Sequence, residues 1–206
     1  VLPSLPPAAW PQGLGGAASA RMAPGGYRPQ PPGGLAGSGA DEAADAPRIP
    51  EQRAAFVQRH LAAARQAEAG TGIPAAFMVA QAALESGWGR REIVHADGSP
   101  SHNLFGIKAG AGWDGPVAEV TTTEYEGGVA RKVRARFRAY ASHAESFADY
   151  ARLLRASPRY RELIGERSAE GFAQGLQRAG YATDPAYADK LGRTIEATLR
   201  LQRPQG

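Results

Sequence analysis

The stretch from Ile73 to Gly89 constrains the fold of this chain more than any other segment. It is almost entirely apolar, and Pro74 suits the first position of a helix, where a missing N–H costs nothing. Gly87 fits the left-handed residue that closes a helix. The apolar residues between them recur at the spacing of one helical face, at Phe77, Ala80 and Leu84. We therefore predict one buried helix here.

A single acid, Glu85, ends this predicted helix. Apart from Gln81, it is the only strongly polar side chain between Pro74 and Ser86. The negative end of the helix dipole disfavours a carboxylate in the last turn, and burial disfavours its charged form as well. Both effects raise the pKa of Glu85 toward neutrality, which is what a general acid needs. The alternative is a helix-terminal Glu that simply points into water.

Composition sets broad limits on the 206 residues. There is no Cys, so the fold relies on neither disulfides nor thiolate metal sites. The net charge of +4 suits an anionic polymer such as nucleic acid or cell wall, but many solvated surfaces look the same. No apolar run approaches the ~20 residues of a membrane span. The start at Val1 carries no signal-peptide pattern, so we expect any targeting information to lie upstream.

Two regions differ in composition. Residues 1–48 are rich in Pro, Gly and Ala and lack aliphatic periodicity, which predicts a flexible linker. Residues 49–206 carry helical patterns over 50–68 and 90–94, and helix-start signals at Ser142, Ser157-Pro158, Ser168 and Asp184-Pro185. We expect Ile164 to belong to the short helix that starts at Ser157-Pro158, and Leu199 to face inward on the last helix. We predict a mainly helical α+β domain over residues 49–206.

Residues 117–140 form the only predicted sheet, a β-hairpin with its turn at Glu126-Gly127-Gly128. In the second strand an apolar face alternates with a basic one, composed of Lys132, Arg134, Arg136 and Arg138. The basic face could bind nucleic acid, but a solvated face that protects a sheet edge is the better interpretation. Because an isolated hairpin is marginally stable, we expect it to dock on the helices.

Glu85 and Glu124, near the hairpin tip, form a candidate catalytic pair. Glycoside hydrolysis uses two carboxylates across a cleft, one donating a proton and the other activating water or attacking the sugar. Glu119 and Glu126 compete with Glu124 for the second role, and an exposed hairpin Glu is usually just solvated. Spacing alone leaves this choice open.

Aromatic side chains are candidate sugar contacts, although most aromatic residues pack in cores. The candidates are Trp88, Phe105, Trp113, Tyr125, Tyr140, Tyr181 and Tyr187. The four histidines, His60, His95, His102 and His143, show no metal-binding spacing, and no Ser-His-Asp signature is present. We therefore expect neither a metal site nor a cofactor.

Four motifs resemble glycoside hydrolase family 73, and most closely its flagellar peptidoglycan hydrolase domains. They run in the family's order as Ala80-Gln-Ala-Ala-Leu-Glu-Ser-Gly-Trp-Gly89, Asn103-Leu-Phe-Gly-Ile-Lys108, Thr121-Thr-Thr-Glu-Tyr125 and Gly180-Tyr-Ala-Thr-Asp-Pro-Ala-Tyr-Ala-Asp-Lys-Leu191. The resemblance covers residues 50 to about 200. It implies a lysozyme-like α+β fold and a β-N-acetylglucosaminidase that cleaves the β-1,4 bond after N-acetylglucosamine in peptidoglycan.

The resemblance also implies residue roles. Glu85 matches the general acid, Glu124 the second carboxylate and Tyr181 a tyrosine near the scissile sugar. The motifs and the aromatic candidates together give substrate contacts at Trp88, Asn103, Phe105, Trp113, Tyr125 and Tyr187. Glu124 would act as a base at a separation of about 6.5–9.5 Å, whereas a much wider gap favours hairpin closure or attack by the substrate's own acetamido group.

The same resemblance implies a periplasmic enzyme that opens the wall locally for the flagellar rod. Contact with rod proteins would need a further N-terminal domain, which this sequence does not contain. Two alternatives stay open: a muramidase or lytic transglycosylase of the same fold, and a non-catalytic peptidoglycan-binding scaffold. We expect no nucleic-acid partner and no membrane span.

Overall fold

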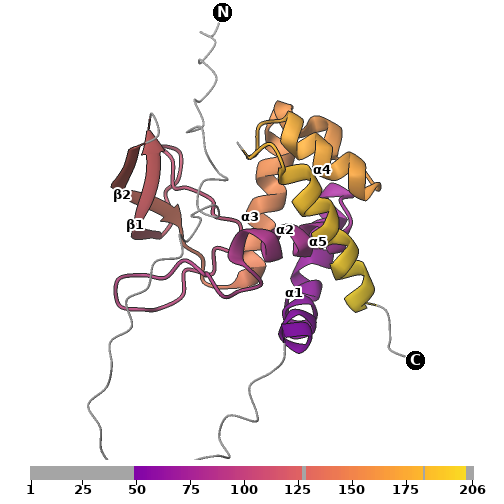
Figure 1. Ribbon diagram of the computed structural model, residues 1–206, viewed down its shortest axis with the longest axis horizontal. Helices are drawn as coiled ribbons and strands as arrows, with labels where there is room; N and C mark the ends of the chain where they lie inside the picture. The colour runs from indigo at the N-terminus through magenta and orange to yellow at the C-terminus, as the bar shows by residue number, and fades with distance from the viewer. Residues whose placement is uncertain (1–48, 127–128, 183, 203–206) are drawn as a thin grey trace, which may run out of the picture.

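The computed structural model describes residues 49–126, 129–182 and 184–202, with the backbone alone for 122–126 and 129–131. The helices gather in one lobe and the hairpin lies beside them (Figure 1). This confirms a mainly helical α+β domain with one hairpin. The predicted linker, residues 1–48, lies outside the described residues. The elements are α1 (Ile49–Thr71), α2 (Ala75–Ser86), β1 (Val117–Glu126), β2 (Val129–Arg138), α3 (His143–Ala156), the 3-10 helix η1 (Pro158–Leu163), α4 (Ala169–Arg178) and α5 (Tyr187–Gln202).

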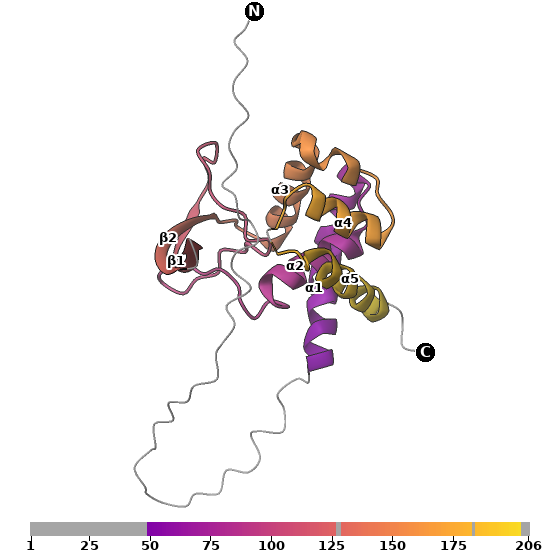
Figure 2. The same cartoon turned by 45° about the horizontal axis from the view of Figure 1, so that its top comes forward.

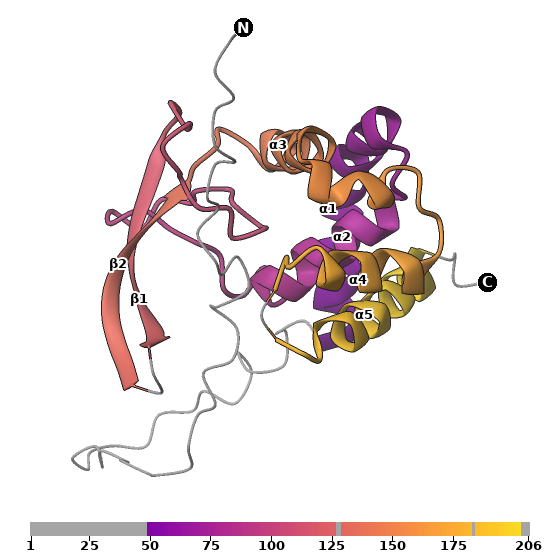
Figure 3. The same ribbon diagram turned by 90° about the horizontal axis from the view of Figure 1, so that it is seen from above.

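Helix α2 lies in the interior of the helical lobe and packs against α1 and α5 (Figure 3). Almost every side chain is buried, including Gln81, as expected for a helix that is apolar on all sides. Pro74 occupies the N-cap, one residue earlier than predicted. Gly87 closes the helix with φ 60°, and its N–H donates to the Ala83 carbonyl, which confirms the predicted left-handed end.

Helix α1 packs on α2 and α3 through a stripe that is rotated from the predicted one. Val57 and Ala64 are buried as expected, whereas Ala54 and Leu61 are only half-buried at its edge. The stripe is centred on the larger aromatic side chain of Phe56, which packs against His60 and Trp88. The buried set is Phe56, Val57, His60, Ala64, Ala67 and Thr71.

The predicted helix starts at Ser142 and Ser168 are confirmed as side-chain caps, whereas Ser157 precedes η1 without a cap hydrogen bond. Ser142 Oγ accepts a hydrogen bond from the Glu145 N–H (3.2 Å), and the Glu145 carboxylate accepts one from the Ala141 N–H (3.0 Å). This reciprocal arrangement satisfies N–H groups that a helix start leaves without partners. Ser168 Oγ likewise accepts from the Gly171 N–H at the start of α4 (3.1 Å).

Three local predictions are wrong. Ile164 follows the end of η1 and is 40% exposed, and Leu199 is 38% exposed because the buried stripe of α5 ends through Thr198 instead. Residues 90–94 form the end of a turn, irregular backbone and an isolated bridge from Val94 to Pro100, and not a short helix. Gly87, Trp88 and Gly89 all have positive φ (60°, 62° and 79°), and this reversal prevents a right-handed helix from continuing.

Strands β1 and β2 form an antiparallel two-stranded sheet, with Val117 opposite Arg138 and Glu126 opposite Val129. The hairpin extends along the side of the helical lobe (Figures 2 and 3). Its predicted apolar face is confirmed where side chains are described, because Ala118, Ala135 and Phe137 are buried. These residues lie outside the main core cluster, so the hairpin has a small apolar core of its own.

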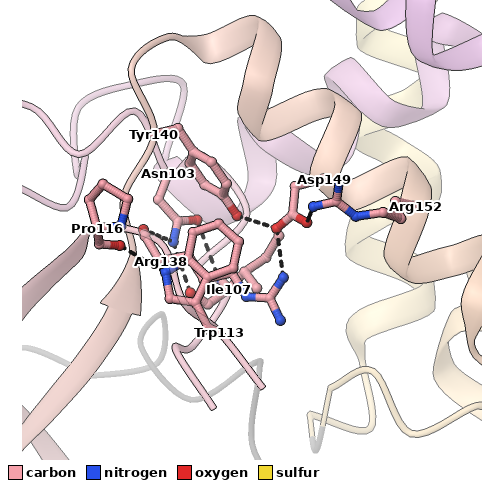
Figure 4. Close-up of polar contacts among 8 residues, drawn as sticks. All are labelled: Asn103, Ile107, Trp113, Pro116, Arg138, Tyr140, Asp149 and Arg152. Carbon is pink, nitrogen blue, oxygen red and sulfur yellow. Dashed lines mark hydrogen bonds and ion pairs between the residues drawn. The ribbon is translucent and has the colours of Figure 1, made fainter. Parts of the chain in front are cut away.

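The base of the hairpin is joined to the helical lobe through one buried carboxylate (Figure 4). Asp149 of α3 is 2% exposed and accepts hydrogen bonds from Arg138 (2.8 Å) and from the Tyr140 hydroxyl (2.6 Å), and it also contacts Arg152. The Trp113 ring covers the Arg138 guanidinium at 4.6 Å. A buried ion pair with these further hydrogen bonds fixes the root of the hairpin to α3.

The loop before the hairpin is shaped by Asn103. Its Nδ2 donates to the carbonyls of Ile107 (2.9 Å) and Arg138 (2.8 Å), and its Oδ1 accepts from the Ile107 N–H (3.1 Å). The loop therefore rests on the end of β2 (Figure 4). Within the described ranges, no helix is long and apolar enough to cross a membrane.

Candidate active site

Glu85 lies in the last turn of α2, where the buried helix reaches the surface, and it is half-buried. Its Oε1 accepts a hydrogen bond from the Tyr187 hydroxyl of α5 (3.1 Å). Burial raises the pKa of the carboxyl to about 7, against the opposing effects of the Tyr187 hydrogen bond and the nearby charge of Arg91. The expected raised pKa is therefore confirmed, and Glu85 can donate a proton near neutral pH.

A chain of buried hydrogen bonds stands behind Glu85. The Tyr150 hydroxyl donates to Gln81 Oε1, Gln81 Nε2 donates to the Tyr187 hydroxyl (3.2 Å), and Tyr187 donates to Glu85. Each of the three supporting side chains is buried, so each donor has a fixed partner. The chain comes from α2, α3 and α5, and it holds the carboxyl in one orientation.

Tyr181 packs next to this chain. Its ring centroid lies 5.8 Å from that of Tyr187, and its hydroxyl donates to the Phe105 carbonyl at 3.4 Å. Burial and the nearby charge of Glu85 raise the pKa of Tyr181 well above its usual value, which keeps the hydroxyl protonated. Tyr181 is only 3% exposed, so its contact with a substrate stays a prediction.

The candidate second carboxylate, Glu124, lies on β1, where its backbone pairs with Arg131. Its side chain falls outside the described residues, as do those of Tyr125 and Glu126. Of the competing acids, Glu119 is described, and it forms ion pairs with Arg134 (2.7 Å) and Arg136 (3.8 Å). Glu119 therefore has a structural partner of its own.

The predicted sugar contacts at Phe105 and Asn103 stay predictions, and the structure places both side chains in the interior. Phe105 is fully buried and stacks on Tyr150 at 4.1 Å. Asn103 is 2% exposed, and its amide is occupied by the backbone of its own loop and of β2. Tyr187 is also buried, and its hydroxyl donates a hydrogen bond to Glu85. Motif membership therefore reflects core packing at these positions.

Two tryptophans remain candidate sugar contacts, because both are half-buried. Trp88 follows Gly87 and packs against Phe56, with the Arg53 guanidinium 5.0 Å from its ring centroid. It lines a hollow of about 280 Å³ between α2 and α5. Trp113 packs on Tyr140 at the hairpin base, and its Nε1 donates to the Pro116 carbonyl (2.8 Å). A larger hollow of about 600 Å³ between α1 and α3 includes none of the candidate residues.

The basic face of β2 is less available than its sequence indicates. Arg138 is held by Asp149, and its side chain is only 11% exposed. Arg134 and Arg136 are exposed but pair with Glu119. Because acidic side chains of the same protein pair with these arginines, a solvated surface is a better interpretation than a nucleic-acid contact.

Sequence reasoning missed three supporting residues. Gln81 was visible as a polar residue inside an apolar helix, which indicates a buried hydrogen-bond partner. Tyr150 reads as an ordinary core aromatic, and Asp149 as a solvated residue beside it. Their roles depend on contacts between distant segments. Glu92, His102 and His143 also lie together, as three potential metal-ligating groups outside this site.

Comparison with known proteins identifies similar domains. Residues 61–199 match the family described as mannosyl-glycoprotein endo-β-N-acetylglucosaminidase. The chain is 51% identical over 148 residues to the peptidoglycan hydrolase FlgJ of Escherichia coli K12, covering 72% of this chain and 47% of that protein. It is 37% identical over 123 residues to the exo-glucosaminidase LytG of Bacillus subtilis, covering 57% and 42%. The match thus spans about half the length of these relatives.

Solved structures agree with this match. A peptidoglycan hydrolase mutant from Sphingomonas sp. A1 superposes with a TM-score of 0.67 at 49% identity, over 72% of this chain and 97% of that one. A truncated glycoside hydrolase domain of Salmonella typhimurium FlgJ gives a TM-score of 0.62 at 51% identity, over 70% and 95%. The described domain therefore has the fold of these hydrolase domains.

Proposed function

Because the chain belongs to the glucosaminidase family of glycoside hydrolases, we propose that it hydrolyses peptidoglycan, cutting the β-1,4 bond after N-acetylglucosamine. The observation that carries this proposal is Glu85, a half-buried acid with a pKa of about 7 at the surface end of a buried helix. An acid of this kind can protonate the leaving oxygen of a glycosidic bond at neutral pH.

The hydrogen bonds around Glu85 define what the acid does. Tyr187 donates to Oε1, which leaves Oε2 to carry the proton that the sugar oxygen receives. The phenol then stabilises the carboxylate that remains after proton transfer, because a hydrogen bond to an ionised group is stronger than one to a neutral group. Tyr187 thus contributes most after the proton has left.

The second chemical group is either Glu124 or the substrate itself. If the two carboxyl groups stand about 6.5–9.5 Å apart, Glu124 activates water and the anomeric configuration inverts. At a wider separation the acetamido group of N-acetylglucosamine attacks instead, with Tyr181 beside it. Since Asp149 anchors the base of the hairpin, the position of Glu124 depends on the direction in which β1 leaves that anchored end.

The cellular setting follows from the relatives. Those with the name peptidoglycan hydrolase FlgJ indicate a wall substrate and a place outside the cytoplasm. We infer a periplasmic enzyme that opens the wall locally for the flagellar rod. Rod proteins would be met through a further domain, since the chain spans about half the length of these relatives.

Digestion of purified sacculi, with mass spectrometry of the new reducing ends, tests the proposal. Terminal N-acetylglucosamine supports it. Terminal muramic acid would identify a muramidase, and anhydro-muramic acid a lytic transglycosylase; either result contradicts the proposed bond. Binding to sacculi without release of soluble sugar would identify a scaffold instead of an enzyme.

A further inference from the structure

Three segments bring metal-ligating side chains together away from Glu85. Glu92 comes directly after the turns that follow α2, His102 precedes the Asn103 loop, and His143 is the first residue of α3. Each offers one ligand atom, and all three atoms lie within 4.8 Å of one another. Glu92 Oε1 and His143 Nε2 are already 2.8 Å apart. The grouping is invisible in the sequence because the donors come from three distant positions.

The backbone and the packing hold these groups in place. His102 has φ 56°, a left-handed conformation that non-glycine residues adopt at a cost, so its ring is placed by the surrounding loop. Its ring lies edge-on to His143 at 4.7 Å, and its Nδ1 is buried without a hydrogen-bond partner among the described residues. His60 also packs edge-on against His143, with 4.7 Å between the ring centroids. Two imidazole rings are thus oriented before any ligand arrives.

We propose that Glu92, His102 and His143 form a binding site for a divalent transition-metal ion, with Zn²⁺ the best-suited member of that class. Two imidazoles and one carboxylate are donors that Zn²⁺ prefers, whereas Mg²⁺ and Ca²⁺ prefer oxygen alone. In a tetrahedral site with ligands at about 2.1 Å, donor atoms are about 3.4 Å apart. The Glu92–His143 separation of 2.8 Å is shorter than this value and all three atoms lie within 4.8 Å, so small side-chain rotations would close the site.

The site has access to solvent. The Glu92 and His143 side chains are 24% and 26% exposed, so a hydrated ion can reach them and keep water in the remaining position. A bound ion would tie the turn after α2 to the Asn103 loop and to the start of α3. Binding therefore stabilises the folded state, because the unfolded chain does not hold the three donors together.

Calorimetric titration of the tag-free, metal-stripped protein with ZnCl2 tests the site, with MgCl2 as the comparison. We expect one saturable Zn²⁺ site, an upward shift of Tm with Zn²⁺ concentration, and neither effect with Mg²⁺. Absence of saturable Zn²⁺ binding would overturn the proposal. The readouts do not depend on catalysis, so this outcome leaves the proposed hydrolase function untouched.

Two substitutions locate the ion. Glu92→Gln keeps an acceptor for His143 but removes the charge, and His102→Asn keeps a residue that tolerates left-handed φ. Each is expected to weaken Zn²⁺ binding at least tenfold, with Tm in chelator close to that of the unsubstituted protein. His95→Asn is the matched control and should bind as before. Equal affinity in all three variants would show that the ion binds elsewhere and that Glu92 and His143 form an ordinary hydrogen-bonded pair.

Discussion

Glu85 and Glu124 lie on elements that are supported in different ways. Helix α2 is enclosed by α1 and α5, and its acid is held from behind by a chain of buried side chains. Strand β1 belongs to a two-stranded sheet that is anchored at its base around Asp149. Core packing therefore fixes the acid, whereas Glu124 belongs to a hairpin that is anchored at its base. The comparison predicts that substitutions near the end of α2 impair proton transfer, whereas substitutions in the hairpin change the position of the second carboxylate.

The largest expected effect is that of Glu85→Gln on sugar release from sacculi. Loss of the general acid should reduce the rate by about 10³-fold, because positioned acid catalysis contributes about 10²–10⁴. Near-normal turnover would remove Glu85 from the mechanism. Gln retains the acceptor for Tyr187, so circular dichroism should show an unchanged fold.

The same variant has a stability signature whose sign follows from the pKa. The carboxyl pKa is about 7 in the folded state against 4.5 ordinarily, so the folded state binds the proton more tightly. The contribution of Glu85 to the free energy of unfolding is therefore fully present below pH ~4.5 and is lost as the pH rises through ~7. At pH 8, urea unfolding should show that Glu85→Gln has a free energy of unfolding about 1–3 kcal/mol higher than the unsubstituted protein. At pH 4 the two proteins should differ little. Equal stability at pH 8 would show that burial does not disfavour the charged Glu85.

The second largest effect is expected for Glu124→Gln, which should lower the rate of sugar release by about 10²-fold if Glu124 acts as the base. Glu126→Gln and Glu119→Gln are the controls, and both should retain activity. A sensitive Glu126 would mean that the second carboxylate is two residues further along β1. Normal activity in all three variants would favour the acetamido group of the substrate as the nucleophile.

Sequence patterns predicted the acid better than its surroundings. The apolar helix, its glycine end and the raised pKa of Glu85 are local properties, so the stretch from Ile73 to Gly89 contains most of the information. The hairpin and the caps at Ser142 and Ser168 are equally local. The roles of Tyr150 and Asp149 are not, because each depends on a partner from another part of the chain. The packing of Phe105 is not local either, because its motif could not reveal that its ring stacks on Tyr150.

A smaller effect, on stability, separates the buried ion pair at the hairpin base from an exposed ion pair on the sheet. Asp149→Ala leaves Arg138 partly buried without its partner, and removing one member of a buried pair costs about 3–5 kcal/mol. Glu119→Ala breaks an exposed pair with Arg134 and should cost less than about 1 kcal/mol. Urea unfolding measures both. Similar costs for the two variants would contradict the view that the buried pair of Asp149 and Arg138 anchors the hairpin.

The smallest effect is a shift in the pH profile for Tyr187→Phe. The Tyr187 hydroxyl stabilises the charged form of Glu85 and so lowers its pKa, against the larger effect of burial. Removing the hydroxyl should raise that pKa and move the alkaline limb of kcat upward by less than about one pH unit. Tyr160→Phe is the matched control, because its hydroxyl contacts Arg159 and not the acid. A downward shift of the alkaline limb would mean that Tyr187 interacts more strongly with the protonated acid than with the carboxylate. The hydrogen-bond chain from Tyr150 would then orient Glu85 without stabilising its charge.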